Sequence, residues 1–151
     1  MLNVGREKIK RKKLEERIEL TQADAESLPF EDNTFDAITV GFGVRNFENL
    51  ERGLAEMHRV LKHGGIAVIL EFSHPKRFPI KQLYNFYFQW ILPLVGRLIS
   101  KHDSAYTYLP QSVKDFPDGI DFINRFEKAG FQSVKCIPLS FGIVSIYLGE
   151  K

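Results

Sequence analysis

Residues 35–70 read FDAITVGFGVRNFENLERGLAEMHRVLKHGGIAVIL, and this stretch decides the fold. Its two ends, Phe35 to Val40 and Ile66 to Leu70, are apolar runs with β-branched residues, as expected for strands that are covered on both faces. Between them, apolar residues recur at spacings of four, three and four, which predicts an amphipathic helix over Asn49 to Lys62. The glycines that follow, in His63-Gly64-Gly65, can adopt the left-handed conformation that ends a helix. The order strand, helix, strand predicts an α/β domain with a parallel sheet and right-handed crossovers.

The end of the chain predicts one more helix and an antiparallel hairpin. Asp118 to Ala129 carries apolar residues on one side, starts near Asp118 or Gly119 and is followed by Gly130, a typical helix stop. Two further apolar runs, Ser133 to Leu139 and Ile143 to Leu148, are joined through a short turn. Because no internal repeat or interdomain linker is visible, we expect all of these elements to belong to one domain.

An aromatic segment separates these two parts of the chain, at about residues 76–117. Lys81 to Ser100 predicts a long helical stretch with Pro93 as a kink or break, and a polar loop over Lys101 to Ser104 follows. Its most lipophilic part, Leu83 to Ile99, is short for a membrane span and is interrupted by polar residues and proline, so no transmembrane helix is predicted. The segment is interpreted as an insertion or lid that packs as ordinary core, cradles an apolar ligand or rests on a membrane surface.

Composition and charge narrow the function classes. The 151 residues are 44% hydrophobic and 26% charged, which excludes a disordered or collagen-like chain and indicates one globular domain or part of one. The net charge of +2 and the mixed charges of Leu2 to Leu14, a predicted outer helix, favour no nucleic acid partner. Next to it, Ile18 to Gln22 predicts a short strand. The lone Cys136 favours a reduced, cytoplasmic setting, and the four histidines lack the spacing of a metal site, so no metal is expected.

Three segments should lie together at one edge of the sheet. In an open parallel sheet, ligands bind outside the carboxyl ends of the strands, which are followed here by Asp24-Ala25, Gly41 to Asn46 and Glu71 to Pro75. The carboxylate of Asp24 and a neighbouring backbone donor can bind the amino group and a ring nitrogen of adenine, and Gly41 allows close approach of a flat ligand. The alternative is that Asp24 is a turn residue and that the glycines only terminate a strand.

Several motifs, in order along the chain, resemble the ubiquinone/menaquinone biosynthesis methyltransferases, the UbiE family, within the class I fold that uses S-adenosylmethionine. They are Asp24-Ala25-Glu26 with Leu28-Pro29-Phe30, the turn Gly43-Val44-Arg45-Asn46, Arg59-Val60-Leu61-Lys62 with Gly64-Gly65, Glu71-Phe72-Ser73, and Tyr106-Thr107-Tyr108-Leu109 followed by Ser112 and Phe116-Pro117. The resemblance runs over nearly the whole chain, and Arg45-Asn46 with Glu71-x-Ser73 makes it specific. It implies that residues 1–151 are the carboxyl-terminal part of a single methyltransferase domain. The implied fold is an incomplete Rossmann-like α/β sheet with helices on both faces and an antiparallel hairpin at the end.

The resemblance has two departures. His63 stands where the family usually has proline, in a loop that should tolerate the change. The family also begins with a helical cap, a first strand ending in a glycine-rich cofactor loop and a second strand ending in an acid that holds the ribose. This chain matches only from the helix after that second strand, and no GxGxG precedes Asp24. In the family's strand order, 3-2-1-4-5-7-6, the two absent strands are central, so we expect either direct packing of Ile18 to Gln22 against Phe35 to Val40 or a homodimer that covers the gap.

The resemblance implies methyl transfer from S-adenosylmethionine to a ring carbon of a polyprenyl hydroquinone, demethylmenaquinol or a related benzoquinol. Carried over residue by residue, Asp24 and Ala25 contact the adenine and Gly41 lines the cofactor pocket. Arg45 stabilises the developing phenolate, and Asn46 orients it.

Some of these assignments have alternatives. Arg45 is equally well explained as the partner of Glu48 in an ion pair at a helix entry. Tyr106 and Tyr108 are expected to approach the substrate ring, although aromatic packing explains them too. His74 is a weaker candidate for the general base.

We therefore expect a quinone C-methyltransferase whose 151 residues here are inactive alone, located in the cytoplasm or peripherally at the inner face of the membrane. The alternatives are a non-catalytic interaction module and a class I methyltransferase for another small molecule. The last of these has no need for a prenyl-sized apolar channel.

Overall fold

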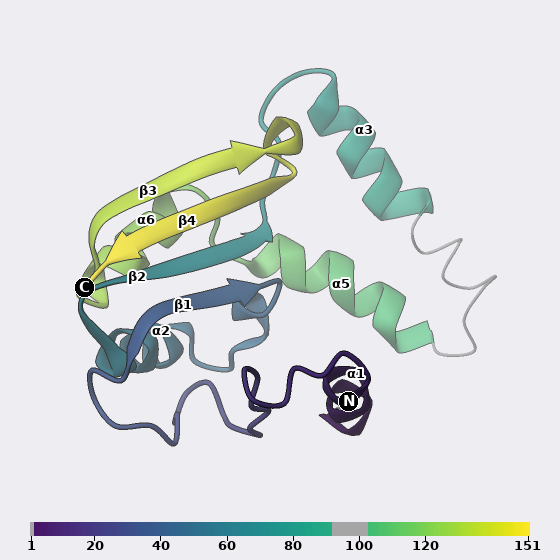
Figure 1. Ribbon diagram of the computed structural model, residues 1–151. Helices are drawn as coiled ribbons and strands as arrows, with labels where there is room; N and C mark the ends of the chain where they lie inside the picture. Colours follow the sequence, from purple (N-terminus) through teal and green to yellow (C-terminus); the bar gives the residue numbers. More distant parts are fainter. Residues whose placement is uncertain (1, 92–102) are drawn as a thin grey trace.

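The computed structural model describes residues 2–91 and 103–151 and contains one mixed sheet with helices beside it (Figure 1). The strands are β1 (Phe35–Gly41), β2 (Leu61–Phe72), β3 (Gln132–Leu139) and β4 (Val144–Glu150). The α-helices are α1 (Leu2–Arg11), α2 (Leu50–Val60), α3 (Ile80–Phe86), α5 (Asp103–Asp115) and α6 (Ile120–Lys128). Short 3₁₀ turns occupy Val44–Asn46 and Ser140–Gly142, and a π-helical turn over Tyr87–Ile91 continues α3.

The sheet has the order β1-β2-β4-β3. β1 pairs with β2 in parallel, and α2 forms the crossover between them, whereas β4 runs antiparallel to both β2 and β3. The predicted strand-helix-strand unit and the predicted antiparallel hairpin are therefore confirmed. Asn49 begins α2, because its side chain accepts a hydrogen bond from the Arg52 N–H at 3.0 Å.

The predicted strand over residues 18–22 does not form. These residues lie outside the sheet, and among the described residues β1 pairs only with β2. Direct packing of Ile18 to Gln22 against β1 was therefore wrong. The physical reason is that Leu20 packs against α1, where a Cβ on Gly5 would come within 2.8 Å of it, so its apolar side chain is already in use away from the sheet.

The end of α2 also differs from the prediction. The helix stops at Val60, and Leu61 is extended and fully buried as the first residue of β2. Gly64 has a positive φ of 77°, as predicted for a glycine here, but it lies within β2. Its N–H donates to the carbonyl of Lys151 at 2.7 Å, and the Lys151 N–H donates to Gly65 at 3.0 Å. The glycine pair therefore joins β2 to the last residue of the chain.

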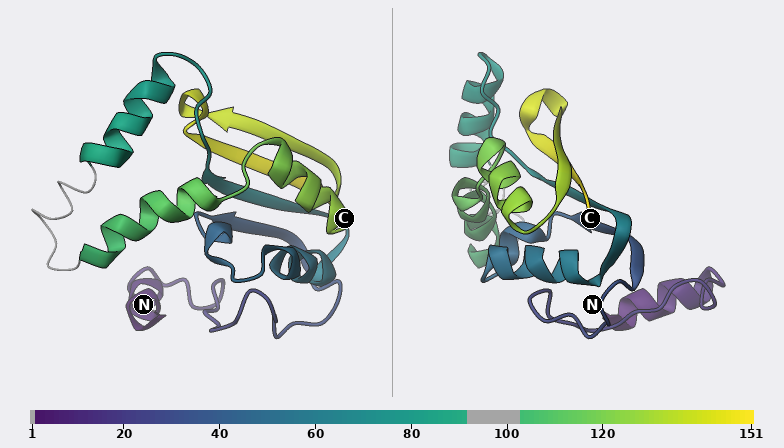
Figure 2. Two further views of the ribbon diagram at one scale, coloured as in Figure 1. Left: turned by 180° about the vertical axis from the view of Figure 1, so that it is seen from behind. Right: turned by 90° about the vertical axis from the view of Figure 1, so that its left-hand side faces the viewer.

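One face of the sheet is covered by helices and the other is not (Figures 1 and 2). α2 and α6 lie against the covered face, and α5 lies on the same side beside the carboxyl edge of β1 and β2. Of the described helices, only α1 lies on the other side, beyond β1, and none of its residues is buried. The prediction of strands covered on both faces is thus not met by the described residues, since the helices that flank the sheet sit on one side.

The core fills the space between the covered face and its helices. α2 contributes Leu54 and Met57, and α6 contributes Phe122 and Phe126, which pack over Tyr147 of β4. The Phe122 and Tyr147 rings lie 4.5 Å apart between centroids, close enough for a favourable aromatic contact.

The aromatic insertion is helical where it is described. α3 and its π-helical turn come from the predicted helical stretch, while Pro93 and the rest of that stretch lie outside the described residues. Asp103 and Ser104 were expected in a polar loop but begin α5. Phe116, just after α5, is buried against Phe122 and connects the insertion to the core.

Candidate active site

Two of the three predicted site segments, those that follow β1 and end β2, meet at the carboxyl edge of these strands. β1 ends at Gly41, and the chain then turns through Phe42 and Gly43 into the 3₁₀ turn, which buried Val44 anchors in the core. The Phe42 N–H donates to the Leu70 carbonyl at 2.8 Å, so the two strand ends stay side by side. This arrangement places the side chains after β1 next to those that end β2.

Arg45 is held by Glu71 of β2. Its Nη1 lies 2.8 Å from Glu71 Oε1 and also donates to the Phe42 carbonyl at 2.6 Å. The side chain of Glu71 is fully buried. Because a buried carboxylate without a partner is strongly unfavourable, the ion pair with Arg45 is needed to stabilise the folded chain. The predicted alternative partner, Glu48, is exposed and does not form this ion pair.

The guanidinium of Arg45 keeps donors for a ligand. Only its Nη1 is engaged in the bonds described above, and its Nε is buried without a hydrogen-bond partner. The Cζ atom lies 5.4 Å from the centroid of the Phe72 ring, within the range of a cation–π contact. Glu71 and Phe72 therefore fix the orientation of Arg45 while leaving part of its hydrogen-bonding capacity unused.

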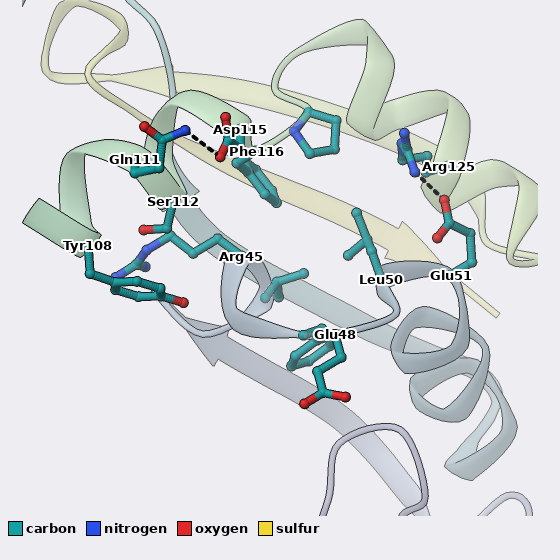
Figure 3. A pocket seen from close by; sticks show the side chains of 13 residues that line it. Arg45, Glu48, Leu50, Glu51, Tyr108, Gln111, Ser112, Asp115, Phe116 and Arg125 are labelled. Atoms are coloured by element: carbon teal, nitrogen blue, oxygen red, sulfur yellow. Dashed lines mark hydrogen bonds and ion pairs between the residues drawn. The ribbon is translucent and has the colours of Figure 1, made fainter.

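A pocket of about 450 Å³ opens beside this turn (Figure 3). Its walls come from the 3₁₀ turn, the start of α2, α5 and Arg125 of α6. Arg45 and Tyr108 line the pocket, and the Tyr108 hydroxyl donates to Asn46 Oδ1 at 2.9 Å, so the structure brings these three predicted residues together. Tyr106 belongs to α5, but its side chain lies outside the described residues. The lining side chains are Val44, Arg45, Phe47, Glu48, Leu50, Glu51, Tyr108, Gln111, Ser112, Asp115, Phe116, Pro117 and Arg125.

Asp24 and Ala25 form a tight turn that is bridged to Ser27. The Oδ1 atom of Asp24 accepts from the Glu26 N–H at 2.9 Å, and its carbonyl accepts from the Ser27 N–H at 3.1 Å. The second carboxylate oxygen of Asp24 and the N–H of Ala25 have no hydrogen-bond partner among the described residues. The turn therefore presents one acceptor beside one donor.

This turn is fastened to α2 by a network that sequence reasoning missed. Glu26 Oε1 accepts from the Asn49 N–H at 2.7 Å, and Glu56 Oε2 accepts from the Leu28 N–H at 2.8 Å. Arg59 completes the network by bonding the carbonyls of Leu28 and Phe30 and the carboxylates of Glu56 and Asp32. We call Glu56 and Arg59 the clamp.

The charges of the clamp stabilise each other. Hydrogen bonds from Arg59 hold the pKa of Glu56 at about 2, well below the ordinary value of 4.5. The hydrogen bond from Glu56 in turn raises the pKa of Arg59. Both side chains are therefore charged at neutral pH, and the segment from Asp24 to Phe30 is held beside α2 in one conformation.

Gly41 faces free space at the end of β1. A Cβ on this residue would meet nothing within 4 Å, and its φ is outside the left-handed region. The described chain therefore gives no steric reason for glycine here, and the position has room for a ligand that lies close to the backbone.

A second, apolar pocket of about 460 Å³ shares Phe72 with the region around Arg45. Tyr84 of α3 is buried. Its hydroxyl has no hydrogen-bond partner among the described residues, and burial raises its pKa to about 12. The pocket is bounded by Phe72, Ile80, Leu83, Tyr84, Tyr87, Phe88, Leu109, Phe141 and Ile143. Binding of an apolar ligand was one of the three roles predicted for the insertion, and this pocket has the apolar lining that such a role requires.

Two residues after β2 have structural partners far away in sequence. The Ser73 hydroxyl lies 2.9 Å from the Ser145 hydroxyl and 3.0 Å from the Gly142 carbonyl, which fastens β2 to β4. The backbone N–H of His74 donates to Asp118 Oδ2 at 2.7 Å, and its Nδ1 lies 3.5 Å from the same oxygen. The role of His74 as a general base stays a prediction.

The described residues contain no group of three or more histidine, cysteine, aspartate and glutamate side chains arranged to hold a metal ion. Within residues 2–91 and 103–151, no helix is long and apolar enough to cross a membrane.

Solved structures define the class of the fold. A SAM-dependent methyltransferase of Thermotoga maritima superposes with a TM-score of 0.65 at 20% identity, covering 95% of this chain and 68% of that one. A SAM-dependent methyltransferase of Aquifex aeolicus gives a TM-score of 0.64 at 17% identity, covering 97% and 61%. The chain therefore has the Rossmann-like α/β fold of the class I S-adenosylmethionine-dependent methyltransferases, as predicted.

Sequence comparison identifies the family. The model of the ubiE/COQ5 methyltransferase family matches residues 1–151, so this chain belongs to that family. Demethylmenaquinone methyltransferases of Bacteroides fragilis and Porphyromonas gingivalis are 51% and 42% identical over all 151 residues. A ubiquinone/menaquinone biosynthesis C-methyltransferase UbiE of Geotalea uraniireducens is 44% identical over the same span. The chain covers 62%, 62% and 64% of the length of these three relatives.

Proposed function

We propose that this chain is the carboxyl-terminal part of a domain that transfers a methyl group from S-adenosylmethionine to a ring carbon of a polyprenyl hydroquinone. The observation that carries the proposal is the match of residues 1–151 to the ubiE/COQ5 methyltransferase family. The names of the relatives support demethylmenaquinol or a related benzoquinol as substrate. Because the chain spans less than two thirds of these relatives, we propose that residues 1–151, with the insertion at about 76–117, are inactive alone.

The residues present fit the adenosine part of the cofactor at two points. The free acceptor of Asp24 and the free donor of Ala25 match the amino group and a ring nitrogen of adenine. The space at Gly41 leaves room for the cofactor beside the end of β1. The clamp supports this assignment because it fixes the turn that carries the donor and acceptor.

The bound cofactor supplies an electrophilic methyl group at its sulfonium, and the chain must hold the acceptor ring and stabilise the charge on it. Arg45 does so by donating its unused N–H groups to the phenolate oxygen, which favours loss of the phenolic proton. The phenolate then supplies electron density to the attacking ring carbon, and that carbon loses its own proton to a base once the methyl group is bonded. Glu71 keeps the guanidinium in one orientation, so little reorganisation is needed as charge develops. Asn46 orients the phenolate, and Tyr108 fixes the Asn46 side chain by its hydrogen bond. Tyr106 is kept as a second residue that approaches the substrate ring, on the resemblance to the family alone.

The apolar pocket favours a polyprenyl substrate over another small molecule. It adjoins the Arg45 region through Phe72 and offers about 460 Å³ lined by aromatic and aliphatic side chains. A hydroquinone ring beside Arg45 can place its first isoprenoid units there. A class I methyltransferase for a small polar substrate would have no use for this cavity.

We also propose peripheral contact with the inner face of the membrane, from a cytoplasmic location. The insertion exposes large apolar side chains, including Phe78, Leu83, Phe86 and Trp90, the last with 67% of its surface exposed. Lys76, Arg77 and Lys81 flank them and suit an anionic lipid surface. A homodimer over the incomplete sheet remains a second proposal from the sequence.

Isothermal titration with S-adenosylmethionine and S-adenosylhomocysteine tests the cofactor assignment. We expect saturable binding when the chain is extended upstream to the length of its relatives, and none by residues 1–151 alone. An Asp24→Asn variant of the extended protein should bind more weakly, because it replaces the charged acceptor. Tight binding by the 151 residues alone would overturn the proposal that they are inactive by themselves.

Methyl transfer by the extended protein tests the role of Arg45 and excludes a purely non-catalytic module. Arg45→Lys should lower kcat with demethylmenaquinol about 100-fold, because a lysine cannot bond Glu71 and the phenolate in the same geometry. Affinity for S-adenosylhomocysteine should not change. Arg52→Lys, an exposed replacement of the same kind on α2, is the matched control. Absence of any methyl transfer by the extended protein would favour an interaction module.

A further inference from the structure

The apolar pocket reaches the surface of the molecule among apolar side chains. Three of the residues that line it, Leu83, Tyr87 and Phe141, are also exposed, and we call these three the rim. Leu83 and Tyr87 come from α3 and its π-helical turn, whereas Phe141 comes from the 3₁₀ turn between β3 and β4. Figures 1 and 2 show this turn beside the chain that leads into α3. Two segments that are distant in sequence therefore expose apolar side chains at the entrance of one pocket.

Phe141 has an unfavourable position for a residue in water. Its side chain is 82% exposed, and its backbone lies in the left-handed region, at φ 59° and ψ 23°, which is uncommon for a bulky residue. Ser140 before it and Gly142 after it also have positive φ values, 47° and 89°. An exposed aromatic ring and a strained backbone both cost free energy. Strain of this kind at the mouth of a pocket points to a function for the ring.

The turn that carries Phe141 is fixed by bonds to the segment after β2. The Ser73 hydroxyl donates to the Gly142 carbonyl at 3.0 Å, and the Ser73 N–H donates to the Ile143 carbonyl at 2.9 Å. The Ile143 N–H donates to the Ser140 carbonyl at 3.2 Å and closes the turn. Because the segment after β2 also leads into α3, these bonds place Phe141 beside α3 without any burial of its ring.

The two segments that carry the rim contain no negative charge. Residues 72–91 include Lys76, Arg77 and Lys81 but none of the 19 acidic residues of the chain, and residues 136–149 have no charged side chain. Exposed apolar side chains flanked by bases match a bilayer with anionic headgroups, which offers an apolar interior beneath a negatively charged surface.

We propose that the rim inserts into an anionic lipid bilayer, with Phe141 as an insertion point separate from α3, so that the apolar pocket opens directly into the acyl region. This inference rests on the proposed function, because it names the surface through which the polyprenyl substrate arrives. Only the isoprenoid units nearest the ring enter the pocket, and the rest of the tail stays in the bilayer. Burial of the Phe141 ring in lipid offsets the cost of exposing it in water.

A second copy of this chain fits the rim less well. A symmetric contact through the rim brings Lys76, Arg77 and Lys81 of both copies to one interface, and like charges in a contact are unfavourable. An anionic bilayer suits the apolar side chains and the positive charges at once.

Tryptophan fluorescence with vesicles of equal parts phosphatidylcholine and phosphatidylglycerol tests the proposal. Trp90 is the only tryptophan of the 151 residues, so the parent chain reports on the helical side, and Phe141→Trp in a Trp90→Phe background reports on the turn. We expect vesicles to shift the emission of both proteins to shorter wavelength, and lipids brominated on the acyl chains to quench both. A shift for Trp90 but not for the Phe141→Trp variant would overturn this inference and leave the proposed membrane contact standing. No shift in either protein would contradict both.

Vesicle co-sedimentation measures the contribution of Phe141. Phe141→Asn should lower binding to the same vesicles about 10-fold, because asparagine tolerates the left-handed backbone while the apolar ring is lost. Ile120→Asn, the same replacement at an exposed apolar position of α6, is the matched control and should not change binding. Circular dichroism checks that each variant keeps its fold.

Two results of the binding experiment would overturn the inference. One is equal vesicle binding by the parent and Phe141→Asn. The other is a lipid-free dimer of the parent that Phe141→Asn dissociates, which would assign the rim to a second copy. Vesicle binding by the 151-residue chain requires neither cofactor nor methyl transfer, so failure of this inference is distinguishable from failure of the proposed reaction, which the extended protein tests.

Discussion

The two faces of the sheet are built from the same strands and from similar residues, yet only one of them is packed. On the covered face, Ile69 and Tyr147 lie under Phe122 and Phe126 of α6 and are inaccessible. On the uncovered face, the neighbouring Ile66 is 42% exposed although it differs from Ile69 in nothing but its position. The difference shows that a strand with apolar residues on both sides needs a covering layer on each side. The strand does not supply that layer, which has to come from elsewhere in the chain or from another chain.

The largest expected loss of stability comes from a substitution on the covered face. Phe126→Ala should lower the free energy of unfolding by about 3–5 kcal/mol, because it removes a ring that packs on Phe131 and lies against Gly149 of β4. Phe86→Ala, which truncates a phenylalanine that is 56% exposed on α3, should cost less than about 1 kcal/mol. Urea unfolding followed by circular dichroism measures both. Equal losses in the two variants would mean that the covered face is not the core.

A second prediction concerns the charged pair at the end of the covered face. Glu71→Gln should cost about 3 kcal/mol, because it leaves the buried guanidinium of Arg45 without its counter-charge. Glu48→Gln should change stability by less than about 0.5 kcal/mol, since Glu48 is exposed and does not pair with Arg45. The same unfolding experiment at neutral pH compares them. A larger loss for Glu48→Gln would restore the partner first predicted from the sequence.

The clamp allows a prediction about pH. The pKa of Glu56 is about 2 in the folded chain against an ordinary 4.5, so its contribution to stability is complete above about pH 4.5 and is lost as the pH falls toward 2. Glu56→Gln should therefore be about 1–2 kcal/mol less stable than the parent at pH 7, and the two stabilities should converge near pH 2. Glu127→Gln, at an exposed position of α6, is the control. A difference that persists unchanged at pH 2 would contradict an ionic origin.

The sequence predicted elements whose signals are local. The spacing of Leu50, Leu54 and Met57 sufficed for α2, and Asn49 at its start is the observed cap. The prediction from sequence failed at Ile18 to Gln22. A strand needs a partner strand, and the pattern of apolar residues does not reveal whether one is available.

The candidate site was predicted to a similar degree. Segment ends placed Gly41 and Arg45 at the carboxyl edge of the sheet, since carboxyl ends of parallel strands meet there. Asp24 was placed there by a strand that does not form. The bonds that give these residues their chemistry join Arg45 to Glu71, 26 residues away, and Asn46 to Tyr108, 62 residues away. Such pairings follow from packing. The sequence alone does not distinguish Glu71 or Tyr108 from the many other carboxylates and hydroxyls in the chain as the partner.

The smallest expected change in stability comes from a substitution on the uncovered face, and a matched substitution on the covered face makes the comparison direct. Ile66→Thr should change the stability of the 151-residue chain by less than about 0.5 kcal/mol, because Ile66 is partly exposed to water on the uncovered face. Ile69→Thr makes the same substitution three residues along the same strand and should cost at least about 2 kcal/mol, since it places a hydroxyl among fully buried side chains. Urea unfolding of the two variants is a matched measurement, in which the face is the main difference.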